Sequence, residues 1–274
     1  MVFFLFRVLL APFAVVVGTW AQRRFGDAVG GLVIGLPLAS VPLLWLVALQ
    51  HGATFTTSMI RALLVGGVAE GAVMWLYAHL TSKVTPSRAL AMTLLAFAFG
   101  AALVSVFNLS ALVAGLLTAL GFALSMRWWP VSASTSPASP GRPRLWPRAL
   151  LAALLTMALA TLAGRLGPVL SGLIDAVPAT SLMMAFFTHQ EHGADATSHF
   201  LYGVTRGSFS FLASMIVLVA MLNGGSISLA FGVSMLVAFL VQGSFQIYDF
   251  ARARRVARHG SSATRPDDAN VAFA

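Results

Sequence analysis

The chain has 274 residues, of which 58% are hydrophobic and only 9% are charged, and its mean hydropathy is +0.87. So few polar side chains cannot cover a water-soluble globule, whereas a lipid bilayer needs no such cover. The net charge of +9 would suggest nucleic-acid binding in a soluble protein, but here the basic residues stand between apolar segments, so we expect the lipid bilayer and no nucleic acid as partner. The composition predicts an all-α, multi-pass integral membrane protein.

Five apolar segments follow one another in residues 1–129, which we take as the first transmembrane repeat. The first segment has no basic stretch before it, and its sequence Arg7-Val-Leu-Leu-Ala11 recurs as Arg148-Ala-Leu-Leu-Ala152 in mid-chain, where a signal peptide cannot lie. We therefore expect a retained helix. The five predicted spans are residues 2–21, 27–49, 57–80, 87–107 and 111–129.

The sequence changes character after the fifth span. Residues 130–147 hold five prolines and four serines, which predicts a flexible cytoplasmic linker. Residues 148–250 form a second transmembrane repeat with four predicted spans at 148–164, 167–188, 197–221 and 226–248. Residues 251–274 are basic and polar, and we expect them to be a largely disordered cytoplasmic tail. The prediction is nine transmembrane helices.

The two repeats are related by an internal duplication. Residues 7–66 align without a gap on residues 148–207 at an offset of 141, and 15 of the 60 pairs are identical. Because five spans separate the starts of the two copies, equivalent helices should cross the membrane in opposite directions, as inverted repeats of five and four spans. The identical pairs include Arg24/Arg165, Gly26/Gly167, Gly31/Gly172, Pro37/Pro178, Ser40/Ser181, His51/His192, Gly52/Gly193 and Gly66/Gly207.

Loop charges indicate the orientation. With the N-terminus outside and the C-terminus in the cytoplasm, twelve basic residues fall in cytoplasmic segments and about two in outer segments. An excess of Lys and Arg on the cytoplasmic side is the usual distribution in inner-membrane proteins. Eight or ten spans would break this alternation, so the charges favour nine.

Each copy carries a proline within its second helix, in Gly30-Gly-Leu-Val-Ile-Gly-Leu-Pro37-Leu-Ala-Ser40 and in Ser171-Gly-Leu-Ile-Asp-Ala-Val-Pro178-Ala-Thr-Ser181. Proline lacks an amide hydrogen and clashes with the carbonyl four residues back, so such a turn leaves unpaired carbonyls near mid-membrane. One interpretation is a substrate site between two broken helices. The other is a pair of ordinary kinks whose glycines allow close helix packing. The predicted substrate-binding residues are Pro37, Ser40, Asp175, Pro178, Thr180 and Ser181.

Charged residues inside apolar spans are the next signal, because each is costly in hydrocarbon. Asp175 lies one turn before Pro178, and its counterpart in the first copy is Ile34. We expect Asp175 or Glu70 to take up and release a proton and Arg206 or Arg61 to attract an anionic group. The alternative is that Glu70 and Arg206 form an ion pair that only holds the two halves together.

No sequence motif indicates an enzyme, and we predict no catalytic residue, cofactor or metal. Hydrolase, zinc-protease and nucleotide-binding motifs are missing from the sequence. The segment His189-Gln-Glu-His192 with Asp195 and His199 has metal-ligand chemistry, but Gly193 should interrupt the helix there. A solvated connecting loop is the plainer interpretation.

The pattern Arg24-Phe-Gly26-x4-Gly31-Leu-x4-Pro37-x2-Ser40, ending near His51-Gly52, resembles the GlpM-like family of small bacterial inner-membrane proteins. The resemblance covers about 60 residues of each copy, roughly half of the chain. It implies a multi-pass protein of the bacterial cytoplasmic membrane, connected with envelope polysaccharide production. Here the unit is fused in tandem, with an additional fifth span that inverts the second copy.

Two functional hypotheses follow. The first is a secondary transporter driven by protons. It would move a small molecule or ion by rocking the two repeats about the broken helices. The alternative is a non-catalytic scaffold or accessory subunit of an envelope polysaccharide or lipid biosynthesis complex. The sequence leaves open the substrate, the direction of transport, and whether the chain forms a homo-oligomer or binds an envelope-biosynthesis partner.

Overall fold

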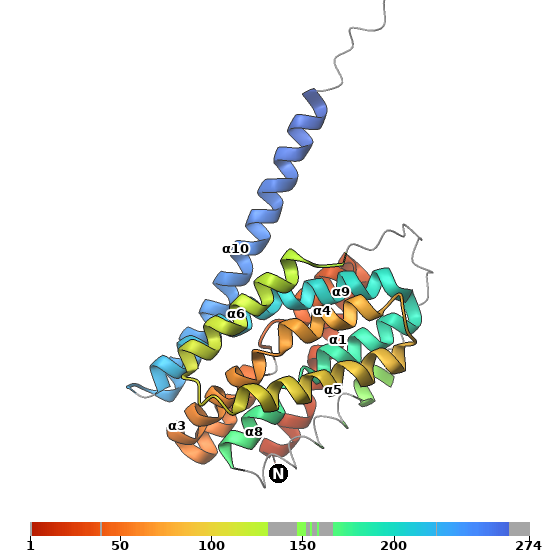
Figure 1. Cartoon of the computed structure of the whole chain (residues 1–274). Helices are drawn as coiled ribbons and strands as arrows, with labels where there is room; N and C mark the ends of the chain where they lie inside the picture. Colours follow the sequence, from red (N-terminus) through yellow and green to blue (C-terminus); the bar gives the residue numbers. More distant parts are fainter. Residues whose placement is uncertain are drawn as a thin grey trace, which may run out of the picture.

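The computed structural model describes residues 2–38, 40–130, 147–151, 154, 158, 167–222 and 224–262, and its regular structure in these ranges is helical (Figure 1). Residues 131–146 of the linker expected at 130–147, most of the span expected at 148–164 and the end of the chain lie outside the described residues. The helices are α1 (Val2–Phe25), α2 (Asp27–Ile34), α3 (Ser40–Gly67), α4 (Glu70–Leu80), α5 (Pro86–Ser105), α6 (Ala111–Arg127), α8 (Pro168–Asp175), α9 (Ala179–Leu222) and α10 (Ile227–Ser262).

Four helical stretches in the described residues are long and apolar enough to cross a membrane: Ser40–Leu80, Pro86–Ser105, Pro168–Leu222 and Ile227–Ile247. Helix α6 is apolar but shorter. Large apolar side chains point outward on α5, α6 and α10, where Phe99, Leu116 and Leu240 are each at least 60% exposed. A bilayer would cover such side chains, whereas water would not. The helical, multi-pass class predicted from composition agrees with this architecture, and the count of nine spans stays a prediction.

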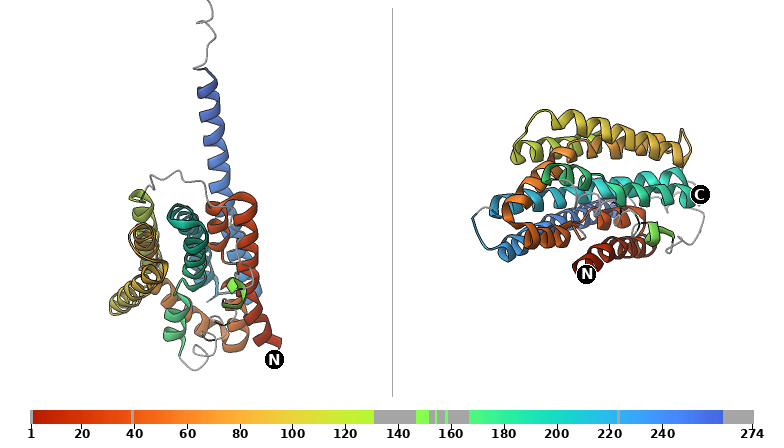
Figure 2. Two further views of the ribbon diagram at one scale, coloured as in Figure 1. Left: turned by 90° about the vertical axis from the view of Figure 1, so that its right-hand side faces the viewer. Right: turned by 90° about the horizontal axis from the view of Figure 1, so that it is seen from below.

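Helix α9 lies at the centre of the bundle. Figure 2 shows it between a layer that contains α4, α5 and α6 and a layer that contains α1, α2 and α10. The buried core forms two apolar clusters, one around α3 and the second half of α9, the other around α4 and the first half of α9. Leu64 and Met215 belong to the first cluster and Met74 and Met184 to the second.

Local sequence signals account for several helix ends. Pro86 is in the first turn of α5, where its missing amide hydrogen costs nothing. Ser110 caps α6, because its hydroxyl accepts a hydrogen bond from the Val113 amide at 3.3 Å. Helix α10 continues to Ser262, so the first part of the tail that we expected to be disordered is helical. Alanine and arginine, which dominate residues 251–258, are strong helix formers and extend the span beyond the bundle (Figure 1).

Two glycines change the direction of the long helices. Gly52 in α3 has φ 82° and ψ 171°, and Gly193 in α9 has φ 82° and ψ −169°. L-amino acids with a side chain avoid this backbone region, so glycine is required there. In Figure 1 the chain of α9 folds back on itself, and residues before and after Gly193 share one core cluster. The expected interruption at Gly193 is confirmed by these backbone angles.

Candidate functional site

The two proline turns have the same backbone geometry. Helix α2 ends three residues before Pro37, and α8 ends three residues before Pro178. The proline ring prevents the helix from continuing, so at each proline the chain passes through a short non-helical turn before the next helix starts. Four backbone hydrogen bonds recur at an offset of 141. They are Gly35–Gly31 (2.9 Å) and Ala176–Gly172 (2.9 Å), Leu36–Val33 (3.2 Å) and Val177–Ile174 (3.1 Å), Leu38–Leu36 (2.8 Å) and Ala179–Val177 (2.6 Å), and Val41–Pro37 (3.2 Å) and Leu182–Pro178 (2.9 Å), each written amide donor first.

Glycines bring each broken helix into backbone contact with the kinked helix of the other half. A Cβ on Gly31 would collide with the Phe200 carbonyl oxygen and the Val204 amide nitrogen of α9. A Cβ on Gly172 would collide with the Met59 carbonyl oxygen and the Leu63 amide nitrogen of α3, which lie 141 residues before Phe200 and Val204. One further contact repeats in the same way: Gly35 meets Gly207, and Ala176 meets Gly66. The packing interpretation of the glycines thus holds at both turns.

The predicted substrate-binding residues lie at these two turns. Pro37 is buried, and Ser40 opens α3 with a partly buried side chain. In the second half, Asp175 ends α8, and Pro178, Thr180 and Ser181 follow it in the turn and at the start of α9, with Ser181 buried. Hydroxyl and carboxylate groups, partly or fully buried, therefore lie at both turns between the helices. This is the chemistry of a polar binding site within an apolar bundle.

Glu70 and Arg206 contact different residues. Glu70 begins α4, directly after the break at Val68 and Ala69, and accepts a hydrogen bond from the Ser208 hydroxyl of α9 at 3.3 Å. The Arg206 guanidinium donates to the Phe245 carbonyl of α10 at 3.0 Å and lies over the Phe245 ring at 5.2 Å. The alternative of a Glu70–Arg206 ion pair is thus not what the structure shows, because Glu70 bonds to Ser208 and Arg206 to Phe245.

Arg61 has a structural role. Its Nε donates to the Leu109 carbonyl at 2.8 Å, and its Nη2 donates to the Asn108 carbonyl at 3.0 Å. Asn108 has φ 47°, so the turn between α5 and α6 leaves carbonyl groups that no helix amide reaches. Arg61 satisfies two of them from α3 and fixes this turn against the bundle.

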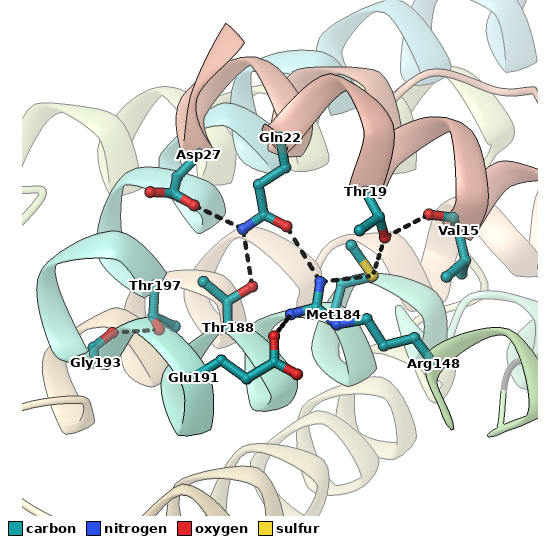
Figure 3. A network of polar contacts seen from close by, with 10 residues as sticks. All are labelled: Val15, Thr19, Gln22, Asp27, Arg148, Met184, Thr188, Glu191, Gly193 and Thr197. Atoms are coloured by element: carbon teal, nitrogen blue, oxygen red, sulfur yellow. Dashed lines mark hydrogen bonds and ion pairs between the residues drawn. The ribbon is translucent and has the colours of Figure 1, made fainter. Parts of the chain in front are cut away.

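The most extensive polar cluster in the described residues surrounds Arg148 (Figure 3). The Arg148 side chain is 0% exposed, and its Nη2 pairs with a Glu191 carboxylate oxygen at 2.7 Å. Its Nη1 donates to the Gln22 amide oxygen at 3.2 Å, and the guanidinium carbon lies 5.6 Å from the centre of the Phe187 ring. Arg148 thus joins α1, α9 and the described residues 147–151.

Gln22 extends the cluster to α2. Its amide nitrogen donates to an Asp27 carboxylate oxygen at 2.6 Å and to the Thr188 hydroxyl at 3.1 Å. Sequence reasoning missed this cluster, because Gln22 looked like a loop residue and Arg148 like one more cytoplasmic cation. The partners of Arg148 lie 126 and 43 residues away in the chain, so no local pattern could indicate them. The single hint was the Arg7/Arg148 identity between the repeats.

His189 lies on a neighbouring face of α9. Its Nε2 is 2.9 Å from the Thr81 carbonyl oxygen, and its ring meets the Tyr77 ring edge to face at 6.1 Å between centroids. Within the part of the chain that the structure describes, His, Asp and Glu side chains do not gather in threes as a metal site would require. In this region His189 contributes to packing between α4 and α9.

A comparison of the chain with protein-family models, with curated proteins and with solved structures finds no match. The GlpM-like resemblance therefore stays a prediction from the glycines, proline and arginine of the repeat. What the protein does has to be argued from its own geometry.

Proposed function

We propose that the chain is a membrane protein of nine spans in two inverted repeats, with its N-terminus outside and its C-terminus in the cytoplasm. Matching geometry supports the duplication. Helices α2 and α8 have bounds that differ by 141 at both ends. The Thr56 hydroxyl donates to the Gly52 carbonyl at 2.9 Å, and the Thr197 hydroxyl donates to the Gly193 carbonyl at 2.7 Å, again at this offset.

The lengths of the two longest apolar stretches support the count of spans. Ser40–Leu80 has 41 residues and Pro168–Leu222 has 55. At 1.5 Å per residue these would be about 60 Å and about 80 Å long, against a hydrocarbon core of about 30 Å. Reversals at Gly52 and at Gly193 divide these stretches, and once α2 is counted with the start of α3 the segments 27–51, 53–80, 168–192 and 194–222 are each long enough for one crossing. The membrane surface is where such reversals belong.

Contacts between distant segments support the orientation. Gln22 bonds to Thr188, and Trp129 donates to the Ser198 hydroxyl at 3.1 Å; all four residues belong to the ends of spans that loop charges assign to the cytoplasm. Arg61 reaches the turn at residues 108 and 109, which the same assignment puts outside. The hydrogen bonds thus connect ends that share a predicted side of the membrane.

We further propose that the protein is a secondary transporter with its substrate site between residues 35–40 and 175–181. The repeated broken turn carries this proposal, since each turn packs against the other repeat and would be moved by any rocking of the halves. The substrate is a small molecule or ion that the hydroxyls of Ser40, Thr180 and Ser181 and the carboxylate of Asp175 can bind. Glu70, at the break between α3 and α4, is a second carboxylate near the same interface.

The proton is the proposed coupling ion, with Asp175 as its carrier. We expect Asp175→Asn to reduce solute-driven proton flux to the level of protein-free liposomes, because an amide cannot exchange a proton. The assay uses purified protein in liposomes that enclose a pH-sensitive dye, to which pools of sugars, amino acids and organic acids are added in turn. Asp195→Asn makes the same chemical change at the turn after Gly193 and should leave flux unchanged.

Undiminished flux in Asp175→Asn would reject the proton-carrier role. A wild-type protein that moves no solute in any pool, and that co-purifies in fixed ratio with envelope-biosynthesis enzymes, would reject transport in favour of the accessory-subunit hypothesis.

A further inference from the structure

The polar cluster formed by Gln22, Asp27, Arg148, Thr188 and Glu191 is separate from the proposed substrate site. On α9, Met184, Thr188 and Glu191 follow Ser181 at helical spacing and share one face of the helix. They lie between the broken turn at Pro178 and the reversal at Gly193. Along α9 the cluster therefore stands between the proposed substrate site and Gly193, and Figure 3 shows the cluster beside Gly193.

The cluster holds three elements against α9. Arg148 comes from residues 147–151, Gln22 from α1 and Asp27 from the first turn of α2. The Arg148 charge is buried completely, and Glu191, its ion-pair partner, is 16% exposed. Arg148 and Glu191 both belong to the second repeat, and the bonds of Gln22 to Arg148 and Thr188 join the first repeat to it. These bonds keep that end of the interface closed while they persist.

Stability alone does not account for the cluster. The Arg148 Nε is buried without a hydrogen-bond partner, and Met184 sulfur at 3.9 Å is a weak acceptor for Nη1. A partly satisfied buried ion pair costs about as much as it returns, and apolar residues of similar volume often do better. Such a pair is better suited to a contact that must open than to one that must only hold.

The equivalent positions of the other repeat cannot form this cluster. At an offset of 141, Arg148 has its counterpart in Arg7, but Glu191 is replaced by Gln50, and the positions of Gln22, Asp27, Met184 and Thr188 are occupied by Ala163, Pro168, Leu43 and Val47. The repeat architecture can thus be built without the polar cluster. Its presence at one end only indicates a function tied to that side of the membrane.

We propose that Gln22, Asp27, Arg148, Thr188 and Glu191 form an inner gate, in which Glu191 holds Arg148 against Gln22, and that the bonds of Gln22 to Arg148 and Thr188 must separate before the site at Ser181 opens toward the cytoplasm. This inference rests on the proposed transport function and adds the side on which the structure is closed. Removing the Glu191 charge takes away the ion pair that positions Arg148 and leaves the buried Arg148 charge poorly compensated, which favours the open form.

Labelling of single cysteines tests the gate, since the natural chain contains none. Ser181→Cys is exposed to a membrane-impermeant maleimide in inside-out vesicles, without substrate. We expect Glu191→Gln to raise the labelling rate about tenfold or more, the population change that 1.4 kcal/mol produces. Exchange of the charges in Arg148→Glu/Glu191→Arg should return the rate toward that of the unmodified gate. Arg127→Gln, an exposed cation at the end of α6, should leave it unchanged.

Ser214→Cys, fully buried in α9 next to Met215 of the core cluster around α3, reports on general unfolding and should stay unlabelled in every variant. The gate is rejected if Glu191→Gln leaves the labelling rate of Ser181→Cys unchanged, or if Arg127→Gln raises that rate equally. It is also rejected if Ser214→Cys becomes labelled in parallel, because the ion pair would then have only a structural role. Because no substrate is used, the labelling result does not depend on the flux assay. If the gate fails its test, the flux assay still tests transport, and if the flux assay fails, the labelling still tests the gate.

Discussion

Substitution of alanine for Gly31 or Gly172 should destabilise the folded protein by about 3 kcal/mol, the upper end of the range for overpacked interiors. At both positions a Cβ would collide with backbone atoms of a neighbouring helix, which cannot move aside as a flexible side chain does. Helices α2 and α8 would have to separate from α9 and α3, and both contacts between the repeats would be lost. Thermal unfolding in detergent, followed by size-exclusion elution, measures the effect.

Gly232→Ala is the matched control, because Gly232 lies within α10 with open space where its Cβ would be. Alanine there should stabilise the helix by up to about 1 kcal/mol. Equal stability of Gly31→Ala and Gly232→Ala would contradict the close backbone packing of α2 on α9. If only one of Gly31→Ala and Gly172→Ala destabilised the protein, the equivalence of the two contacts would be lost.

Alanine in place of Gly52 or Gly193 should cost about 1–3 kcal/mol at each position through backbone strain. Both glycines have φ 82° with extended ψ, and both have no atom within 4 Å of the place where a Cβ would be. The effect is therefore one of conformation and not of packing. The double variant should show the sum of the two losses, since the sites are distant in the sequence and lie in different helices.

Gly167→Ala separates strain from the general loss of glycine. Gly167 also has open space around its Cβ position, but its φ is −64°, which any residue adopts. Its counterpart Gly26 has φ 94°, so Gly26→Ala should be strained where Gly167→Ala is tolerated. The measurement is the melting temperature of each variant. If Gly167→Ala lowered it as much as the substitutions at positive φ, the reversals at Gly52 and Gly193 would not require glycine.

The sequence was informative wherever a local rule operates. Proline cannot donate to the helix ladder and glycine alone adopts positive φ at low cost, so the helix ends before Pro37 and Pro178 and the breaks at Gly52 and Gly193 could be located from single residues. The apolar composition likewise indicated the helical membrane class. The prediction of a loop around residues 189–199 was wrong, because the reversal at Gly193 is one residue long and the helix continues on both sides of it.

The polar contacts could not be read in this way. Glu70 and Arg206 have the charges of an ion pair, but they lie on α4 and α9 with the Ser208 hydroxyl and the Phe245 carbonyl as partners. Arg61, one of the two cations expected to attract an anionic group, donates to the carbonyls of Leu109 and Asn108, contacts that its position in the sequence does not indicate. Pairing inside a bundle depends on the rotation of each helix about its axis, which the spacing of charges along one segment does not determine.

The central claim is that the two repeats lie upside down relative to each other, and paired cysteines test it most directly. Ser58 is partly exposed and His199 is exposed, and the two occupy equivalent positions at the offset of 141, just after the reversals at Gly52 and Gly193. In intact cells, a membrane-impermeant maleimide should label Ser58→Cys and not His199→Cys, and in inside-out vesicles it should label His199→Cys and not Ser58→Cys. Labelling of both cysteines from the same side would contradict the inverted arrangement.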